Sequence, residues 1–124
     1  MKLEIENMQI ARVINFLDGL SLKGLKSIHR TNLSRKLQEK LRVIADNERQ
    51  IMEELKDDKE KMKEELQKFY KERVIIDGGD SQIMLQSIKE TIKEIVENEE
   101  QEFSNDDAYA VACLYEAFNL GNKE

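Results

Sequence analysis

Residues 27–73 contain neither glycine nor proline. Because proline is the strongest helix breaker, nothing in this stretch forbids a long helix. Its apolar side chains recur at steps of mainly three, four and seven residues, which is typical of an amphipathic helix with a coiled-coil-like stripe. The stripe consists of Leu33, Leu37, Leu41, Ile44, Ile51, Leu55, Met62, Leu66 and Phe69.

The stretch can form either one rod or a helical hairpin. A single rod would be roughly 70 Å long at about 1.5 Å per residue. Residues 56–61 include no apolar side chain, so a sharp bend there costs little core. We favour a hairpin that turns near Asp57 and Asp58, because a chain of 124 residues can bury both apolar stripes only by folding them together.

Two short segments predict strands. Leu3 and Ile5 alternate with charged residues, as in a strand with one buried face. Residues 74–76 form a β-branched run, Val74-Ile75-Ile76, that ends at glycines. We expect residues 3–5 to pair with residues 74–76 as a two-stranded patch. Helices must cover this patch, because an isolated pair of strands is marginal in water.

Further helices are expected on either side of these segments. Helical spacing of apolar residues begins at Ile10, with Asn7 as a candidate N-cap, and returns after residues 81 and 104. The expected fold is therefore one mainly α-helical domain over residues 1–124. It is a helical bundle with a long helix or helical hairpin and a minor β patch.

The residue counts restrict the chemistry that the chain can carry. Cys113 is the sole cysteine and His29 the sole histidine, which excludes an internal disulfide and a multi-histidine metal site. Cys113 lies among apolar helix residues, where a free cysteine is usually a small buried hydrophobe. The sequence has no nucleophile-elbow or phosphate-loop motif. We predict a non-enzymatic protein without metal or cofactor.

The expected compartment is the cytoplasm. No apolar run approaches the length of a membrane span, and the first residues lack the apolar core of a signal peptide. A lone cysteine also fits a reducing compartment. We therefore expect no membrane contact.

Positive charge is concentrated in residues 23–42, where Glu39 is the only acid. Such a basic stripe suits a nucleic-acid backbone or an acidic protein surface. The net charge of −6 disfavours nucleic acid, and favours pairing with the protein's own acidic half, within the chain or across a dimer. The candidate contacts are Lys23, Lys26, Arg30, Arg35, Lys36 and Lys40.

Negative charge is concentrated between residues 97 and 107. An acidic run can imitate a nucleic-acid backbone, but it is more often a solvated connection between helices. The candidate acidic contacts are Glu97, Glu99, Glu100 and Glu102.

Five groups of residues occur in order along most of the chain: Leu3-Glu4-Ile5-Glu6-Asn7, Asn15-Phe16-Leu17, Leu22-Lys23-Gly24 with Arg30, Leu37-Gln38-Glu39-Lys40 and Val74-Ile75-Ile76-Asp77-Gly78-Gly79. Together they resemble a family of short proteins of unknown function encoded by phages and prophages of Gram-positive bacteria. The chain departs from the family pattern at residues 56–61, where other members often carry a longer insert; this favours a loop tip. The resemblance implies phage origin and often a place among late structural or tail-module genes, without a known activity.

The leading hypothesis is a phage-encoded accessory protein that acts by protein–protein contacts in virion or tail assembly and self-associates. Its partner is a phage or host protein, and it works in the host-cell cytoplasm or on the virion. The first alternative is a host-directed inhibitor, an anti-defence protein, that acts through the acidic surface. The second is a nucleic-acid-binding regulator that uses residues 23–42; nucleic acid is the less favoured partner.

Overall fold

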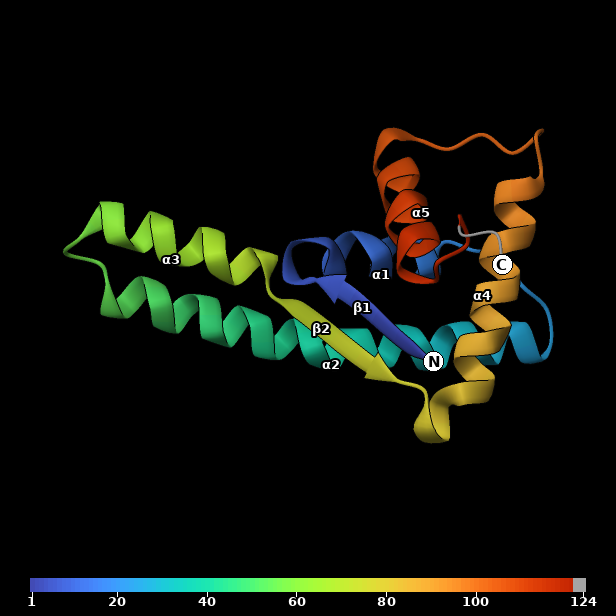
Figure 1. The fold of residues 1–124 in the computed structure, drawn as a ribbon, viewed down its shortest axis with the longest axis horizontal. Helices are drawn as coiled ribbons and strands as arrows, with labels where there is room; N and C mark the ends of the chain where they lie inside the picture. Colours follow the sequence, from blue (N-terminus) through green and yellow to red (C-terminus); the bar gives the residue numbers. More distant parts are fainter. Residues whose placement is uncertain (122–124) are drawn as a thin grey trace.

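The structure, a computed structural model, describes residues 1–121 apart from the side chain of residue 80. Five helices and two strands account for most of it, and Figure 1 shows α2 running the length of the molecule with α4 crossing near its N-terminal end. The elements are β1 (Lys2–Glu6), η1 (Asn7–Gln9), α1 (Ile10–Asp18), α2 (Leu25–Glu54), α3 (Lys59–Lys71), β2 (Arg73–Asp77), η2 (Gly79–Ser81), α4 (Gln82–Glu97) and α5 (Asn105–Ala117). The predicted mainly helical fold is confirmed. None of these helices is long and apolar enough to cross a membrane.

The strands β1 and β2 pair antiparallel, with Leu3 opposite Ile76 and Ile5 opposite Val74. This is the predicted pairing of residues 3–5 with 74–76, extended by one residue at each end. Leu3 and Ile5 point inward and are buried, while the alternate residues are exposed or half-buried. The period of two along a strand therefore gives β1 one apolar and one charged face.

The core lies where β1, β2, α1, α4 and α5 meet the N-terminal half of α2. From α2 this core receives Leu33 and Leu37, and fully buried residues of that helix stop there. We call this part the body. Its buried apolar side chains are Leu3, Ile5, Ile10, Val13, Ile14, Phe16, Leu17, Leu33, Leu37, Ile76, Met84, Leu85, Ile88, Ile92, Ala110, Val111, Leu114 and Phe118.

The long helical stretch folds back as a hairpin, which decides between the two expected arrangements. The helix α2 ends at Glu54 and α3 begins at Lys59, so the turn falls at the predicted Asp57 and Asp58. Asp58 is the N-cap of α3, because its Oδ1 accepts a hydrogen bond of 3.1 Å from the Lys61 N–H. A carboxylate in this position satisfies one of the unpaired N–H groups at the helix start.

The expected N-cap role of Asn7 is wrong. Asn7 is buried, its Nδ2 donates to the Phe69 carbonyl at 2.9 Å, and its backbone N–H donates to the Glu72 carbonyl at 2.8 Å. Both carbonyls lie at the C-terminal end of α3, and the Phe69 carbonyl also accepts a hydrogen bond of 3.1 Å from the Glu72 N–H. Asn7 thus joins η1 to the C-terminal end of α3, and α1 begins later, after a 3-10 turn whose cap residue makes no side-chain bond.

Candidate protein-binding surfaces

The C-terminal half of α2 (residues 42–54) and α3 form an arm that projects from the body (Figure 1). Among the described residues of the arm, one side chain is buried, and it is Phe69 at the base. The other side chains of the seam between the two helices are half-buried: Ile44, Ile51, Leu55, Met62 and Leu66. Two helices alone cannot enclose an apolar seam, because each presents a stripe wider than one neighbour covers. The arm therefore keeps an open apolar side.

That open side deepens into a groove of about 450 Å³ at the base of the arm. One hydrogen bond crosses it, from the Tyr70 hydroxyl to Glu48 Oε2 at 2.7 Å. This bond, with burial and the carboxylate charge as smaller causes, raises the pKa of Tyr70. The groove is lined by Asn7, Met8, Leu41, Ile44, Ala45, Glu48 and Tyr70.

Beyond the groove, another apolar side chain lies on the same side of α2 towards the turn. Met52 lies seven residues beyond Ala45, which places both on the same side of α2. Met52 is 44% exposed and Met8, at the base, is 56% exposed. We call Met8, Leu41, Ala45, Met52 and Tyr70 the groove face. It is an apolar strip whose side chains are exposed or half-buried in the described structure.

Two of the predicted basic contacts are paired within the chain. The Arg30 Nη1 donates to the Leu17 carbonyl at 2.8 Å and to the Leu20 carbonyl at 2.6 Å. Leu17 lies in the last turn of α1 and Leu20 two residues beyond its end, so Arg30 ties the end of that helix to the segment that follows it. Lys26 lies 3.0 Å from Glu94 Oε2 on α4 in an exposed ion pair.

The other basic residues do not share one surface. Lys36 and Lys40 line a small cleft beside Ile75 of β2. Arg35 is five residues before Lys40, which places it about 140° away around α2, and it is exposed. Lys23 lies before α2 begins and is exposed. The basic side chains of residues 23–42 thus lie on several different surfaces of the protein.

The acidic contacts form an exposed segment between α4 and α5. Within residues 1–121 none of the four makes an ion pair. At its start the segment makes a local turn, in which Asn98 Oδ1 accepts from the Glu100 N–H at 3.1 Å, and at its end the Phe103 ring packs edge-on against Phe16 at 6.4 Å. The exposed carboxylates belong to Glu97, Glu99, Glu100 and Glu102.

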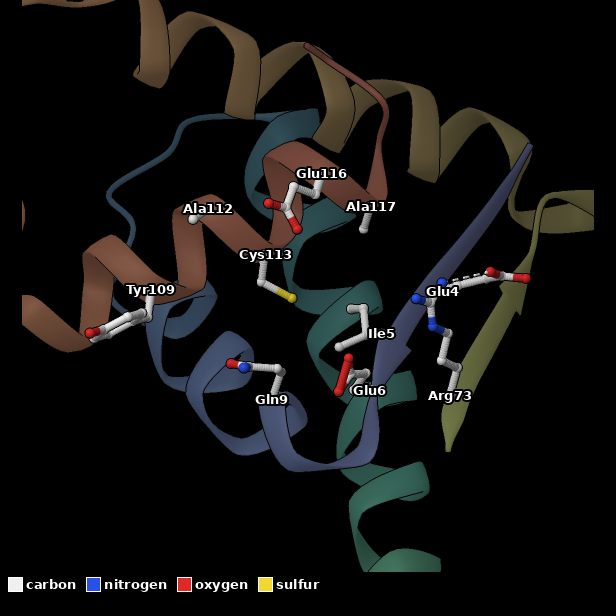
Figure 2. A pocket seen from close by; sticks show the side chains of 10 residues that line it. All are labelled: Glu4, Ile5, Glu6, Gln9, Arg73, Tyr109, Ala112, Cys113, Glu116 and Ala117. Carbon is white, nitrogen blue, oxygen red and sulfur yellow. Dashed lines mark hydrogen bonds and ion pairs between the residues drawn. The ribbon is translucent and has the colours of Figure 1, made fainter. Parts of the chain in front are cut away.

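A second cleft, of about 400 Å³, lies between β1, η1 and α5 (Figure 2). Arg73 and Glu4 pair at its edge at 3.4 Å. Cys113 is half-buried in its wall and packs against the core. Burial, and then the carboxylates of Glu116 and Glu6, raise the pKa of the Cys113 thiol. A raised pKa lowers the thiolate fraction at neutral pH and so the reactivity of the thiol.

Sequence reasoning missed the groove face. Its members come from η1, α2 and α3, and no local pattern places Met8 beside Tyr70. The sequence did hold one signal for it. Leu41, Ala45 and Met52 share one side of the long helix, beside the residues of the seam, and make its apolar stripe wider than a single neighbouring helix requires. Comparison with known proteins gave no match: no family model, no curated protein and no solved structure matches the chain. The resemblance to phage proteins stays a prediction.

Proposed function

We propose that this protein acts by binding another protein through the groove face of the arm, without a catalytic step of its own. The observation that carries the proposal is the contrast between the body, whose core is closed, and the arm, whose apolar seam stays half-buried. An apolar strip on a projecting element is typical of an interaction site.

The composition of the groove face supports binding. Met8 and Met52 are exposed methionines, and methionine is a flexible, polarisable side chain that adapts to partners of different shape. The groove between two helices also matches a common mode of recognition, in which the apolar face of a third helix fills a groove.

The chemistry of the second cleft supports binding rather than covalent catalysis. Cys113 is the sole thiol of the chain, and its raised pKa makes it a weaker nucleophile at neutral pH than a free thiol. The carboxylates that help to raise this pKa act in the direction opposite to that needed for an activated cysteine.

The context proposed for this binding is virion or tail assembly in the cytoplasm of a phage-infected cell, with a phage or host protein as partner. The resemblance described above is the reason for this context. Self-association also stays a prediction, and sedimentation velocity over a range of protein concentrations tests it.

Affinity capture from phage-infected cells tests the arm as the docking element. The test variant carries Ala45→Glu and Met52→Glu, which place two charges in the groove. The control is Val43→Glu, which places one charge on another side of α2: Val43 is 56% exposed and, two residues before Ala45, lies about 160° away around the helix. We expect the wild type and the control to capture one or more partner proteins that the test variant does not capture. Equal recovery with all three proteins would contradict the proposal.

The inhibitor hypothesis is the second candidate, and a different observation favours it. The four glutamates at the end of α4 and in the segment that follows it are exposed and without ion pairs among the described residues, and Phe103 packs the end of this segment against Phe16. Such a segment can occupy a basic channel. Reversing Glu99, Glu100 and Glu102 to lysine should then abolish inhibition of a nuclease. Reversing Asp57, Glu64 and Glu90, which are also exposed, controls for net charge; equal loss in both variants would refute this candidate.

A further inference from the structure

We propose that the groove face binds an amphipathic helix whose apolar stripe is flanked by acidic residues. This inference rests on the proposed function, in which the arm is the docking element, and adds the chemistry of the partner.

The dimensions of the strip suit a helix. From Leu41 to Met52, α2 rises by about 17 Å at about 1.5 Å per residue, which is about three helical turns. The apolar strip has Met8 at its base and Met52 towards the turn, and α3 bounds it with Tyr70. A partner helix of this length, laid along the strip, would turn the two-helix arm into a three-helix bundle and close its seam.

The charges beside the strip are basic on both helices. On α2, Arg42 and Arg49 lie within about 60° of Ala45, on the side away from the seam. On α3, Lys59 and Lys63 lie within about 60° of Leu66. All four are exposed. These four residues are called the basic rim.

The acids close to the strip do not cancel the basic rim. Glu48 lies inside the groove and is hydrogen-bonded to Tyr70. Glu60 lies about 60° from Lys63, on the side away from Leu66. Asp46 pairs with Arg49, and Glu53 with Lys56, each at 3.1 Å, but these four side chains are 62% to 77% exposed. An exposed pair of this kind is weak and easily exchanged for another partner. The rim therefore selects a helix that carries aspartate or glutamate on both sides of its apolar stripe.

The basic rim also decides against a second copy as the occupant of the groove. In a two-fold dimer the same patch of each copy faces the other. Two groove faces packed together would place one basic rim against another, and like charges across an interface are unfavourable. A nucleic acid is disfavoured by the apolar floor, which offers nothing to a phosphate backbone.

Two synthetic peptides test the inference on the full-length protein. Both carry leucines at helical spacing, and they differ only in the flanking residues, which are glutamate in one and lysine in the other. The reporters are the ¹³C-labelled methyl groups of methionine: Met8 and Met52 lie on the groove face, while Met84 is 6% exposed in the core. We expect the acidic peptide to shift the Met8 and Met52 signals and to bind about tenfold or more tightly than the basic one.

Charge reversal on the arm supplies the matched controls. Arg42→Glu with Arg49→Glu leaves two positive and two negative charges on the rim and should abolish the preference between the peptides. Lys61→Glu with Lys68→Glu makes the same charge change about 140° to 160° away from Lys63 around α3, and should leave the preference unchanged. Methyl spectra without peptide confirm that both variants are folded.

The failures of the two proposals are distinguishable. Equal affinity for both peptides, shifts confined to other methionines, or no shift with either peptide would overturn the inference, and so would Met8 and Met52 signals that move with protein concentration alone. Each of these results leaves the affinity capture unaffected. Capture that is insensitive to Ala45→Glu with Met52→Glu would instead overturn the proposed function.

Discussion

Replacing Arg30 with methionine should destabilise the protein although Arg30 lies in the basic stretch that suggested ligand binding. Its guanidinium group donates at 2.8 Å and 2.6 Å to the carbonyls of Leu17 and Leu20. Methionine keeps the apolar stem of the side chain but removes both donors. The Leu17 carbonyl at the end of α1 and the Leu20 carbonyl just beyond it then lose a half-buried, positively charged partner.

The size of the effect follows from the kind of bond. A hydrogen bond to a charged group contributes about 1.5–3 kcal/mol to stability. Because Arg30 is only half-buried, water replaces part of each lost bond, and we expect the two bonds together to contribute about 2 kcal/mol. Lys26→Met is the matched control, because it removes an ion pair whose side chains are 41% and 66% exposed. Solvent screens such a pair, so its loss costs about 0–1 kcal/mol.

Urea unfolding followed by far-ultraviolet circular dichroism measures this difference. With a urea dependence of about 1–3 kcal/mol per M, Arg30→Met should lower the midpoint by roughly 1 M. Lys26→Met should lower it by less than half as much. If Arg30→Met costs no more than Lys26→Met, the hydrogen bonds do not hold the end of α1, and Arg30 becomes a candidate ligand contact again.

Three further predictions concern the attachment and tip of the arm and the second cleft. Asn7→Ala leaves the Phe69 carbonyl without its side-chain donor, so the free energy of unfolding should fall by about 1–2 kcal/mol, with faster hydrogen exchange at the end of α3 as the local readout. Asp58→Ala removes the N-cap of α3 and should cost about 1 kcal/mol, seen as faster exchange of the first amides of α3 and not of α4. Burial raises the pKa of the Cys113 thiol above its ordinary 9.0, so the folded state keeps a proton that the unfolded state releases. The free energy of unfolding should therefore fall as the pH rises above 9.0 towards the higher pKa of the folded state. Unfolding curves measured below and above this pH should show a smaller fall for Cys113→Ala than for the wild type.

The hairpin and the strand pair were predictable because their signals are local. A run without apolar residues at 56–61 marks the turn, and the two capping candidates Asp57 and Asp58 lie within it. The alternation at Leu3 and Ile5 assigns each side chain to a face before any partner is known. The pairing with residues 74–76 followed because few other β-branched runs are present in the chain.

The roles of Asn7 and Arg30 were not predictable because they depend on contacts distant in sequence. Asn7 precedes a helical pattern, which is where an N-cap stands, but its side chain bonds a carbonyl 62 residues away. Arg30 has the same charge as its neighbours in the basic stretch, and only the fold brings the end of α1 within reach of its guanidinium group. The local pattern fixes the type of residue, whereas the choice between a structural and a binding role requires the packed structure.

The attachment of the arm explains how an open apolar strip can coexist with a defined fold. Asn7 and the Glu48–Tyr70 bond fix the base of the hairpin by hydrogen bonds, whereas the distal seam is held by half-buried contacts alone. Local stability should therefore decrease from the base to the turn, since it follows burial. A helix bound along the groove face would add its contacts mostly where the arm has fewest. The free energy of binding would then include the ordering of the distal arm. The basic rim would repel the rim of a second copy, and this repulsion would keep two unoccupied strips apart.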